Sequence, residues 1–298
     1  MHINSILISF VFHTRSFWPD KLYLQVMFRL KMRKKLNLQN PKTFSEKLQW
    51  LKLYSRKKNY TLMVDKVKAK EYVASILGEE YIIPTLGVWD DPDKIDFNAL
   101  PDKFVLKCNH NSGTGMYICK DKSLMNIEKV KAELRKGLKE NYFLTNREWP
   151  YKDVPRRILA EKYIEPDVIT NDLPDYKFFC FDGEVKAMFI AKDRNKGEHY
   201  VKFDFFDADF NHLPFTNGHP NAEQQPEKPK KFEEMKVLAA KLSKGIPHVR
   251  IDFYEVNGKI YFGEMTFFHW SGMMPFEPEE WDYKFGKWLK LPFNNIVN

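Results

Sequence analysis

The sequence predicts an α+β fold, in which helices and antiparallel strand pairs occupy different stretches of the chain. Three observations carry this prediction. The chain has 298 residues, of which 43% are hydrophobic and 15% aromatic, enough to bury the core of one large or two modest domains. Residues 20–77 show apolar residues at helical spacing. Residues 175–193 and 249–265 each read as two strands joined by a tight turn.

The most informative strand pair is residues 249–265. Apolar and polar residues alternate on both sides of Asn257-Gly258, and these two residues tolerate the positive φ angles of a type I′ turn. Folding the chain about this turn brings Asp252 close to opposite Glu264, because the two lie at similar distances from it. The two carboxylates can therefore share one face of the hairpin.

Two neighbouring carboxylates repel each other unless a cation lies between them or one of them is protonated. Mg²⁺ takes oxygen ligands from one or two carboxylates and completes its shell with phosphate and water. Arg250 is two residues from Asp252 and so points to the same face, where it could pair with a phosphate or with the carboxylates themselves. A surface hairpin with ordinary ion pairs explains the same residues, and the hairpin alone does not choose between the two.

Charge and cysteine content limit the class of protein. The formal net charge is +8 and the pI about 9.1, which suits an anionic partner such as a nucleotide, a polysaccharide or a membrane surface. Cys108, Cys119 and Cys180 lack CxxC spacing and read as reduced thiols of a cytosolic protein without a zinc framework. No apolar run reaches transmembrane length, and residues 3–12 lack the basic start and cleavage site of a signal peptide.

The N-terminal part is expected to be helical. Residues 20–36 predict an amphipathic helix with Asp20 as N-cap, followed by helices over 44–54 and 63–77, the last ended by Gly78. The basic side of the first helix could contact an anionic membrane or glycan, but a solvated face of a helix packed on the domain is the favoured interpretation. Residues 82–84 predict a short strand closed by proline, and residues 90–101 a loop.

A lysine precedes a glycine-containing loop in the next segment. Residues 104–108 and 116–119 predict strands, and the polar loop 109–115 lies between them. Lys107 on the first strand, with backbone N–H groups in the loop, is an arrangement that can hold phosphate. The segment is neither a P-loop nor a dinucleotide-binding fingerprint, and a plain hairpin is the more frequent meaning of such a loop. His110 is interpreted as a loop residue.

The remaining chain alternates strands with loops and helices. Residues 123–144 predict a basic helical segment, and residues 158–166 an apolar strand interrupted by Glu161-Lys162. Strands on both sides of Asp182-Gly183 follow. Residues 194–230 show little periodicity, which is typical of a functional or mobile loop. A helix over 232–242 and a loop over 271–276 complete the prediction.

The order of these elements is more specific than any one of them. The segments NPKTFSEKLQWLKLY, FVLKCNHNSGTG, ILAEKYI, DYKFFCFDGE and YFGEMTF follow one another from Asn40 onward. Together they resemble the ATP-grasp superfamily and, within it, the TupA-like branch named for teichuronopeptide biosynthesis. The resemblance implies two α+β subdomains that hold ATP between them. We expect an N-terminal helical extension over 1–60, a lead-in over 61–102, a small subdomain over 103–165 and a large one over 166–298.

The resemblance also implies roles for individual residues. Lys107 would bind nucleotide phosphate, Asp252 and Glu264 would hold Mg²⁺, and Arg250 would lie near the transferred phosphate. The other implied contacts with ATP come from a flexible loop over the triphosphate, a hinge that reads adenine, an acidic residue at the ribose and a second phosphate lysine: Ser112, Gly113, Gly115, Glu161, Lys162, Tyr163, Ile164, Asp175 and Lys192. Lys202 is the alternative to Lys192. Thr266 stands where many members of the superfamily have an asparagine Mg²⁺ ligand.

The implied reaction is amide formation, in which ATP phosphorylates a carboxylate and an amine attacks the acyl phosphate. The implied substrates are a carboxylate of a cell-surface glycan or its precursor and an amino acid or simple amine, in the cytoplasm or at the inner face of the membrane. A kinase acting on a sugar hydroxyl would use the same nucleotide residues. A metal-dependent glycosyltransferase would use the acidic pair but has no evident use for Lys107 and ILAEKYI. A nucleic-acid-binding module is the least favoured, because the aromatic residues alternate into strands.

Overall fold

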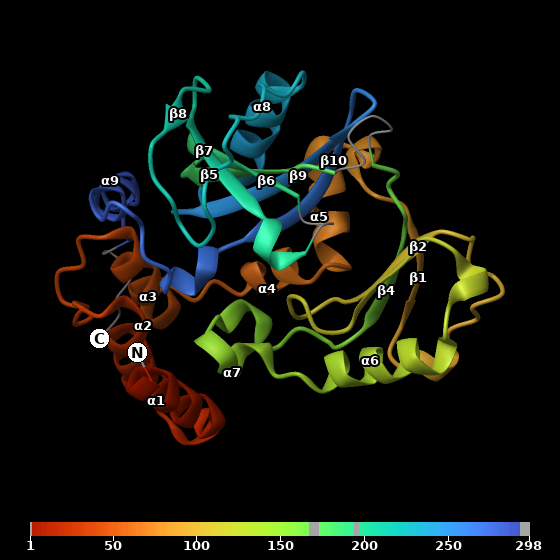
Figure 1. Ribbon diagram of the computed structural model, residues 1–298, viewed down its shortest axis with the longest axis horizontal. Coiled ribbons are helices and arrows are strands. Elements are labelled where there is room, and N and C mark those ends of the chain that lie inside the picture. The colour runs from red at the N-terminus through yellow and green to blue at the C-terminus, as the bar shows by residue number, and fades with distance from the viewer. Residues whose placement is uncertain (1, 167–172, 194–196, 293–298) are drawn as a thin grey trace.

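The computed structural model describes residues 2–166, 173–193 and 197–292, and it contains two separate antiparallel sheets (Figure 1). The smaller sheet has four strands in the order β1-β4-β2-β3. Its strands are β1 (Thr85–Trp89), β2 (Phe104–Cys108), β3 (Met116–Cys119) and β4 (Ile158–Lys162). Helix α6 (Ile127–Lys139) contacts β2 and β3, and Val130 and Leu134 on this helix join Phe104 and Leu106 in a separate small core.

The larger sheet has six strands in the order β10-β9-β5-β6-β7-β8. They are β5 (Asp175–Phe181), β6 (Glu184–Lys192), β7 (Lys202–Asp207), β8 (His212–Leu213), β9 (Val249–Val256) and β10 (Lys259–Thr266). Helix α8 (Phe232–Ser243) covers one face and contacts β5, β6 and β9. On the opposite face, Phe179 packs against Phe44 and Phe285 from two further helices. The larger sheet is therefore buried on both sides.

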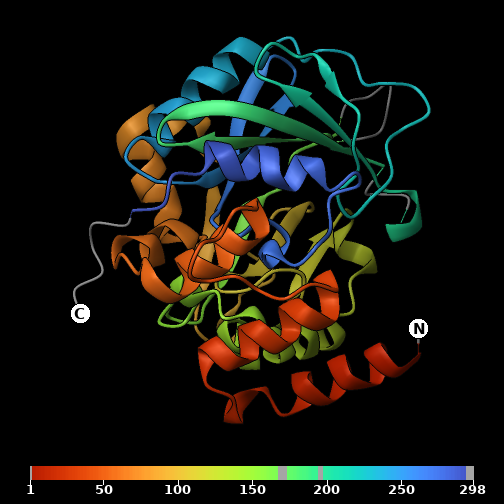
Figure 2. The same cartoon turned by 90° about the vertical axis from the view of Figure 1, so that its left-hand side faces the viewer.

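The other helices surround these sheets. They are α1 (His2–His13), α2 (Asp20–Met32), α3 (Phe44–Tyr54), α4 (Asn59–Val64), α5 (Lys68–Leu77), α7 (Tyr142–Asn146) and α9 (Glu280–Trp288). Short 3₁₀ turns are η1 (Arg15–Phe17), η2 (Glu79–Tyr81), η3 (Pro92–Lys94), η4 (Lys122–Leu124), η5 (Trp149–Tyr151), η7 (Glu198–Tyr200) and η8 (His269–Gly272). Figure 2 shows α1 and α2 together at the base of the molecule, with α9 beside the larger sheet.

Helix α3 shows how local sequence fixes an element and places it in the core. Thr43 caps its N-terminus by accepting a hydrogen bond from the N–H of Glu46, whose carboxylate accepts in return from the N–H of Thr43. Helix α9 anchors the same end, because Asp282 accepts from the N–H of Ser45 at 2.8 Å. A Cβ on Gly286 of α9 would lie 2.2 Å from the carbonyl oxygen of Lys42, so only glycine permits this close approach.

The helix predicted over 20–36 is present as α2 but has different ends. Pro19 occupies the N-cap position, and Asp20 is the first helical residue; its carboxylate pairs with Arg56 and Arg147, each at 2.9 Å. The helix stops at Met32 because Arg33 adopts a left-handed conformation. Five apolar residues of α2 are buried, and Lys34 just beyond it pairs with Glu279 at 2.7 Å. The interpretation of this helix as packed on the domain is confirmed.

Three other predicted elements need correction. The helix predicted over 63–77 is two helices, α4 and α5, separated at residues 65–67, although it ends before Gly78 as expected. The strand predicted over 82–84 begins only after Pro84, as β1. The irregular region 194–230 contains β7, which pairs with β6 over residues 202–207. Its strand pattern, KFDFFD, is too short and too apolar on both faces to show clear alternation.

The hydrophobic cores group the chain in a way that sequence order does not show. Helices α3, α4 and α5 share one core with the larger sheet, α6 and the smaller sheet share a second, and α1 and α2 form a third. The division at residues 60, 102 and 165 stays a prediction. Cys108, Cys119 and Cys180 are buried free thiols, as expected. In the part of the chain that the structure describes, no helix is long and apolar enough to cross a membrane.

Candidate functional site

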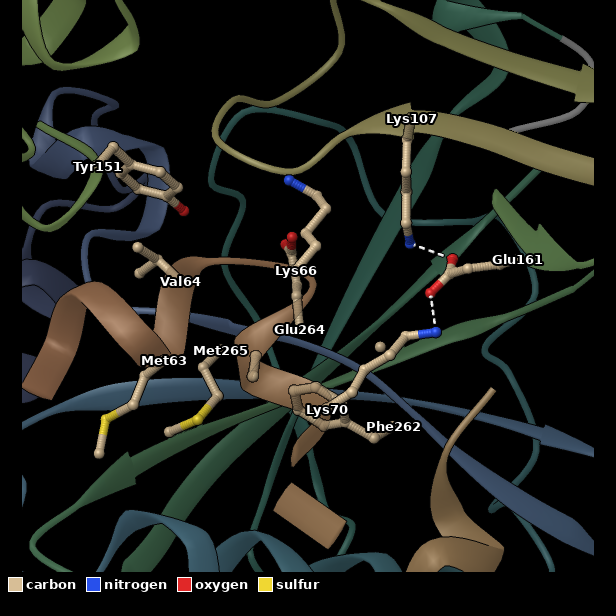
Figure 3. A pocket seen from close by; sticks show the side chains of 12 residues that line it. Met63, Val64, Lys66, Lys70, Lys107, Tyr151, Glu161, Phe262, Glu264 and Met265 are labelled. Carbon is tan, nitrogen blue, oxygen red and sulfur yellow. Dashed lines mark ion pairs between the residues drawn. The ribbon is translucent and has the colours of Figure 1, made fainter. Parts of the chain in front are cut away.

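A cleft lies between the two sheets, and the segment joining α4 to α5 forms part of its wall (Figure 3). Each of the two sheets contributes residues to it, from β2 and β4 on one side and from β10 on the other. The lining residues are Met63, Val64, Lys66, Ala69, Lys70, Lys107, Tyr151, Glu161, Phe262, Gly263, Glu264 and Met265. Lys107, Glu161 and Glu264 were predicted as site residues from distant parts of the sequence, and the fold brings all three to one cleft.

One end of the cleft holds a carboxylate between two lysines. The carboxylate of Glu161 on β4 pairs with Lys107 on β2 and, at 2.6 Å, with Lys70 on α5 (Figure 3). Burial raises the pKa of Glu161, but the two ammonium groups outweigh this and hold it below its usual value. Glu161 is therefore ionised although it is only 4% exposed. The three residues offer two cations and one acceptor. A bound nucleotide could replace the ion pairs between them.

The break between α4 and α5 positions another lysine that the sequence did not single out. Asp65 accepts a hydrogen bond from the side chain of Asn109 at 2.7 Å, and this contact fixes the break against the start of the loop 109–115. Lys66 then extends into the cleft, where its ammonium donates to the carbonyl oxygen of Asn111 at 2.5 Å. Lys66 and Lys70 look like ordinary helix lysines in the sequence. Only the fold shows that both face the cleft.

Beside the cleft, Arg250, Asp252 and Glu264 form one charged cluster. Arg250 donates to both oxygens of Asp252, each at 2.7 Å, and to Glu264 at 3.0 Å. Asp252 lies opposite Glu264 on the paired strands β9 and β10, as expected, but through a shift in register between Phe262 and Glu264. Of the two pairings considered for Arg250, the structure therefore shows the one with the carboxylates.

Lys177 completes this cluster and was missed in the sequence. It lies opposite Asp252 on the neighbouring strand β5, and its ammonium pairs with Asp252 and, at 2.5 Å, with Asp175. The sequence signal was a lysine within an otherwise aromatic strand. Strand alternation places Lys192 on the opposite face, because it is the neighbour of Ala191, which lies opposite Asp175. Lys202 pairs with Lys192 and shares that face, so Lys177 replaces both as the candidate second phosphate lysine.

The two carboxylates differ in their openness to a metal ion. Both oxygens of Asp252 are engaged by Arg250 and Lys177, and the residue is 1% exposed. The side chain of Glu264 is 40% exposed, and its Oε2 accepts no hydrogen bond from a described residue. Figure 3 shows the Glu264 carboxylate and the Lys66 ammonium directed to the same part of the cleft. Burial raises the pKa of Glu264, but Lys177, Arg250 and Lys66 lower it to about 2.

This oxygen set suits Mg²⁺ better than a metal that needs a complete protein cage. Within the described ranges, no group of three or more His, Cys, Asp or Glu could hold a metal. An ion at Glu264 and Asp252 would depend on phosphate and water for its other ligands, as Mg²⁺ in nucleotide sites does. Thr266 is engaged elsewhere: its hydroxyl donates to Glu264 and accepts from Arg250, both at 3.1 Å.

Arg250 is held from behind by a neutral histidine. His269 Nδ1 accepts from Arg250 Nη1 at 2.8 Å, and His269 Nε2 donates to Asn217 at 2.9 Å. Burial and the charge of Arg250 keep the pKa of His269 well below its usual value. This chain of contacts fixes the guanidinium plane from the side away from the carboxylates. Arg250 is itself 7% exposed, so it cannot reorient without moving His269.

The loop 109–115 separates into a packed part and an open part. A Cβ on Gly115 would lie 2.6 Å from Cys108 Sγ and 2.9 Å from the Cα of Gly137 on α6, so Gly115 allows the loop to pack against this helix. Gly113 has no neighbour within 4 Å of such a Cβ, and Ser112 is exposed. His110 is buried and contacts the carbonyl oxygen of Glu140 at 3.2 Å, which supports its interpretation as a loop residue.

The expected hinge begins at the end of β4, an inner strand of the smaller sheet, and continues beyond it. The N–H of Lys162 donates to the carbonyl oxygen of Pro84 at 3.0 Å, while Tyr163 and Ile164 are half-buried. Asp175 is 2% exposed and lies with Lys177 in the charged cluster. The adenine and ribose contacts of these residues stay predictions.

The protein has a cleft between two antiparallel sheets, and basic and acidic side chains line it. This arrangement is that of an ATP-grasp protein. Residues 46–290 match the family model described as TupA-like ATPgrasp, and the chain belongs to this family. None of the curated proteins matches the sequence.

Solved structures with similar folds include two D-alanine–D-alanine ligases. The enzyme from Helicobacter pylori is 16% identical with a TM-score of 0.47, over 83% of this chain and 69% of that one. The enzyme from Bacillus anthracis complexed with ATP is 17% identical with a TM-score of 0.40, over 69% of this chain and 53% of that one. The ATP-grasp ligase PsnB complexed with its minimal precursor is 11% identical with a TM-score of 0.41, over 70% and 53%. The chain thus spans about half the length of the Bacillus anthracis ligase and of PsnB.

Proposed function

We propose that this protein is an ATP- and Mg²⁺-dependent ligase that joins a carboxylate to an amine through an acyl phosphate. The observation that carries the proposal is one continuous cleft with two lysines around Glu161 at one end and the Arg250–Asp252–Glu264 cluster beside its middle. The first set suits the base and phosphates of ATP, and the second suits the transferred phosphate.

The nucleotide would enter by replacing internal ion pairs. Lys107, now paired with Glu161, would turn to a phosphate, and the freed carboxylate of Glu161 would accept from the adenine amino group. Backbone groups of residues 162–164 would read the rest of the adenine edge, and Asp175 would accept from the ribose hydroxyls. Ser112 and Gly113, at the open part of their loop, would cover the triphosphate, and Gly115 would hold that loop on α6.

Charge neutralisation is the main task of the second set. Glu264 and Asp252 would hold Mg²⁺, which would supply positive charge to the phosphates of ATP. Arg250 and Lys177 would bind the transferred phosphate as it moves to the substrate carboxylate. Since phosphoryl transfer needs position and charge more than a nucleophilic side chain, this set is sufficient for the first half of the reaction.

The proposed substrate class is based on the name of the family and not on the residues of the cleft. The family is named for teichuronopeptide biosynthesis, which supports a uronic acid or another glycan carboxylate as one substrate and an amino acid or amine as the other. PsnB is a ligase complexed with a precursor peptide, and the D-alanine ligases join amino acids. We place the reaction in the cytoplasm, and the net charge of +8 supports a polyanionic substrate or contact with the inner membrane face.

The test compares two nucleotides in the same thermal unfolding experiment. A ligand that binds only the folded protein raises the unfolding midpoint by mass action. Mg-ATP should raise it, and UDP-glucose with Mg²⁺ should not. A shift with UDP-glucose alone would favour a glycosyltransferase. Screening uronic acids with amines for ADP release then separates a ligase, which needs both substrates, from a sugar kinase, which releases ADP without an amine.

A further inference from the structure

A buried carboxylate beside the cleft has no assigned task in the steps above. Glu148, between α7 and η5, is 4% exposed. Its Oε1 accepts a hydrogen bond from the hydroxyl of Ser271, while its Oε2 accepts none from any described residue. A nearly buried carboxylate with one oxygen lacking a donor is costly to retain, so it marks a place where a donor from outside can bind.

Two tyrosine hydroxyls lie in the field of the same carboxylate. The rings of Tyr142 and Tyr151 meet edge to face, 4.8 Å between centres. In the described part of the chain neither hydroxyl has a hydrogen-bond partner, and Figure 3 shows that of Tyr151 directed into the cleft. The charge of Glu148 is the largest cause that raises the pKa of Tyr142, followed by burial and by the charge of Glu264. The hydroxyls therefore lie near both carboxylates.

The wall behind Glu148 is rigid. Gln49 donates to the carbonyl oxygens of Ser271 and Gly272, both at 2.9 Å, and Lys52 donates to that of Ser271 at 2.8 Å. These buried contacts hold Ser271 in a left-handed conformation, φ +56°, which costs a non-glycine residue conformational energy. Ser271 is thereby fixed with its hydroxyl on Glu148 rather than on solvent.

The charged groups that face Glu148 come from three other elements. They are Lys52 on α3, Arg250 on β9 and Glu264 on β10. Burial raises the pKa of Glu148, and burial lowers that of Lys52 to about 7. Lys52 forms no ion pair with Glu148 and directs its ammonium to Gln49 and Ser271. Glu148 thus has no ion pair with a described cation, and two of its acidic and hydroxyl neighbours, Glu264 and Tyr151, line the cleft.

We propose that Glu148, Tyr142 and Tyr151 form the binding site for the primary ammonium group of the amine substrate, and that Glu148 accepts its proton. The ammonium would donate to Oε2 of Glu148 and to the two tyrosine oxygens, none of which has a hydrogen-bond partner among the described residues. An acidic, aromatic site excludes a carboxylate at this end and reserves the Arg250 end for the acyl phosphate.

The chemical step rests on the proposed ligase function. The ammonium gives one proton to the Glu148 carboxylate and becomes a neutral amine. Its nitrogen attacks the acyl carbon, the C–N bond forms, and the C–O bond to phosphate breaks. The second proton leaves the nitrogen with the phosphate, which departs as hydrogen phosphate. Glu148 then returns its proton to solvent. A buried carboxylate with a raised pKa is suited to this exchange.

The binding half can be tested without knowing the substrate. Ethylammonium, ethanol and acetate would each be titrated against the full chain by saturation-transfer NMR at pH 7.5. We expect ethylammonium to bind more tightly than the other two. Glu148→Gln should weaken its affinity roughly tenfold or more, as expected for loss of a charged acceptor. Glu128→Gln, whose side chain is 80% exposed on α6, is the matched control and should bind like wild type.

Tyr151→Phe keeps the test decisive if Glu148→Gln fails to fold. It removes a hydroxyl that bonds to no described residue, so the unfolding midpoint should not change. Ethylammonium affinity should nevertheless fall roughly threefold to tenfold. Equal binding by Tyr151→Phe and wild type, or no preference for ethylammonium over acetate, would overturn the site. Failure of the ligase proposal has a different signature, because Mg-ATP would then give no thermal shift while ethylammonium still bound.

Discussion

Asp252 lies opposite Glu264 although Glu264 is one residue further from the hairpin turn. The pairing of β9 and β10 shifts between Phe262 and Glu264, so that Gly263 is an extra residue in β10. A Cβ on Gly263 would lie 3.1 Å from the carbonyl oxygen of Asp252, which explains why the bulge carries glycine. Without it, Glu264 would point to the opposite face of the sheet. The acidic pair is therefore a product of the bulge.

Glu264→Gln should remove Mg²⁺-dependent turnover with little effect on stability. The side chain is 40% exposed, and its ion pair with Arg250 is at the cleft surface, so the loss of unfolding free energy should be about 1 kcal/mol or less. ADP release is the activity measurement, and urea unfolding is the stability measurement. Full activity in this variant would contradict the metal assignment.

Asp252→Asn should, by contrast, destabilise the protein. The change leaves Arg250 and Lys177 buried with one carboxylate fewer, and breaking such a buried network costs roughly 3 kcal/mol or more. Denaturant unfolding at pH 7 would show the difference from Glu264→Gln. Equal stability of the two variants would contradict the buried ion pairs of Asp252 with Arg250 and Lys177.

Lys107→Ala should weaken ATP binding. Its ammonium pairs with Glu161 at the end of the cleft proposed for the nucleotide, and removing a charged donor to phosphate costs roughly tenfold in affinity or more. Isothermal titration with Mg-AMPPNP measures the effect. Lys103→Ala is a suitable control, because Lys103 precedes the same strand but pairs with exposed Glu165 outside the cleft. Unchanged affinity in Lys107→Ala would mean that the phosphate site lies elsewhere.

Gly115→Ala should cost more stability than Gly113→Ala. Both glycines have positive φ, +73° and +92°, so each change costs about 1 to 2 kcal/mol of backbone strain. Only at Gly115 would the new methyl group meet Cys108 and α6, which adds roughly 1 to 3 kcal/mol of overpacking. Thermal unfolding of the two variants side by side measures the difference. Equal midpoints would argue against the packing of this loop on α6.

Stability should fall as the pH drops below about 6.5. Burial lowers the pKa of His248 to about 3 and that of His110 to about 4. Between the unfolded value of 6.5 and these values, the unfolded chain binds protons that the folded protein does not, so acid favours unfolding. His248 alone should cost roughly 3 kcal/mol at pH 4. Unfolding free energies at pH 7, 5.5 and 4.5 test this, and His110→Asn should flatten the pH dependence.

Local sequence was sufficient for much of the fold. The capping box at Thr43 and Glu46, the Asn257-Gly258 turn and the alternation of β9 and β10 each act within a few residues, and the elements that they predict are present. The break between α4 and α5 was missed because it depends on Asn109, a residue far away in the sequence that bonds Asp65. Helix α9 was not predicted either. It contacts α3, which is distant in the sequence, and local sequence does not reveal these contacts.

The sequence by itself determined the α+β class, the hairpin that carries Arg250, Asp252 and Glu264, and the lysine before the glycine loop, because these depend on periodicity and turn chemistry. The tertiary structure decided which charges meet. In the folded protein Asp252 pairs with Arg250 and Lys177, Lys192 lies on the other face of the sheet, and Lys66 and Lys70 line the cleft. Charged side chains interact strongly only when they lie a few ångströms apart. A sequence pattern does not show which residues, distant along the chain, the fold will bring that close.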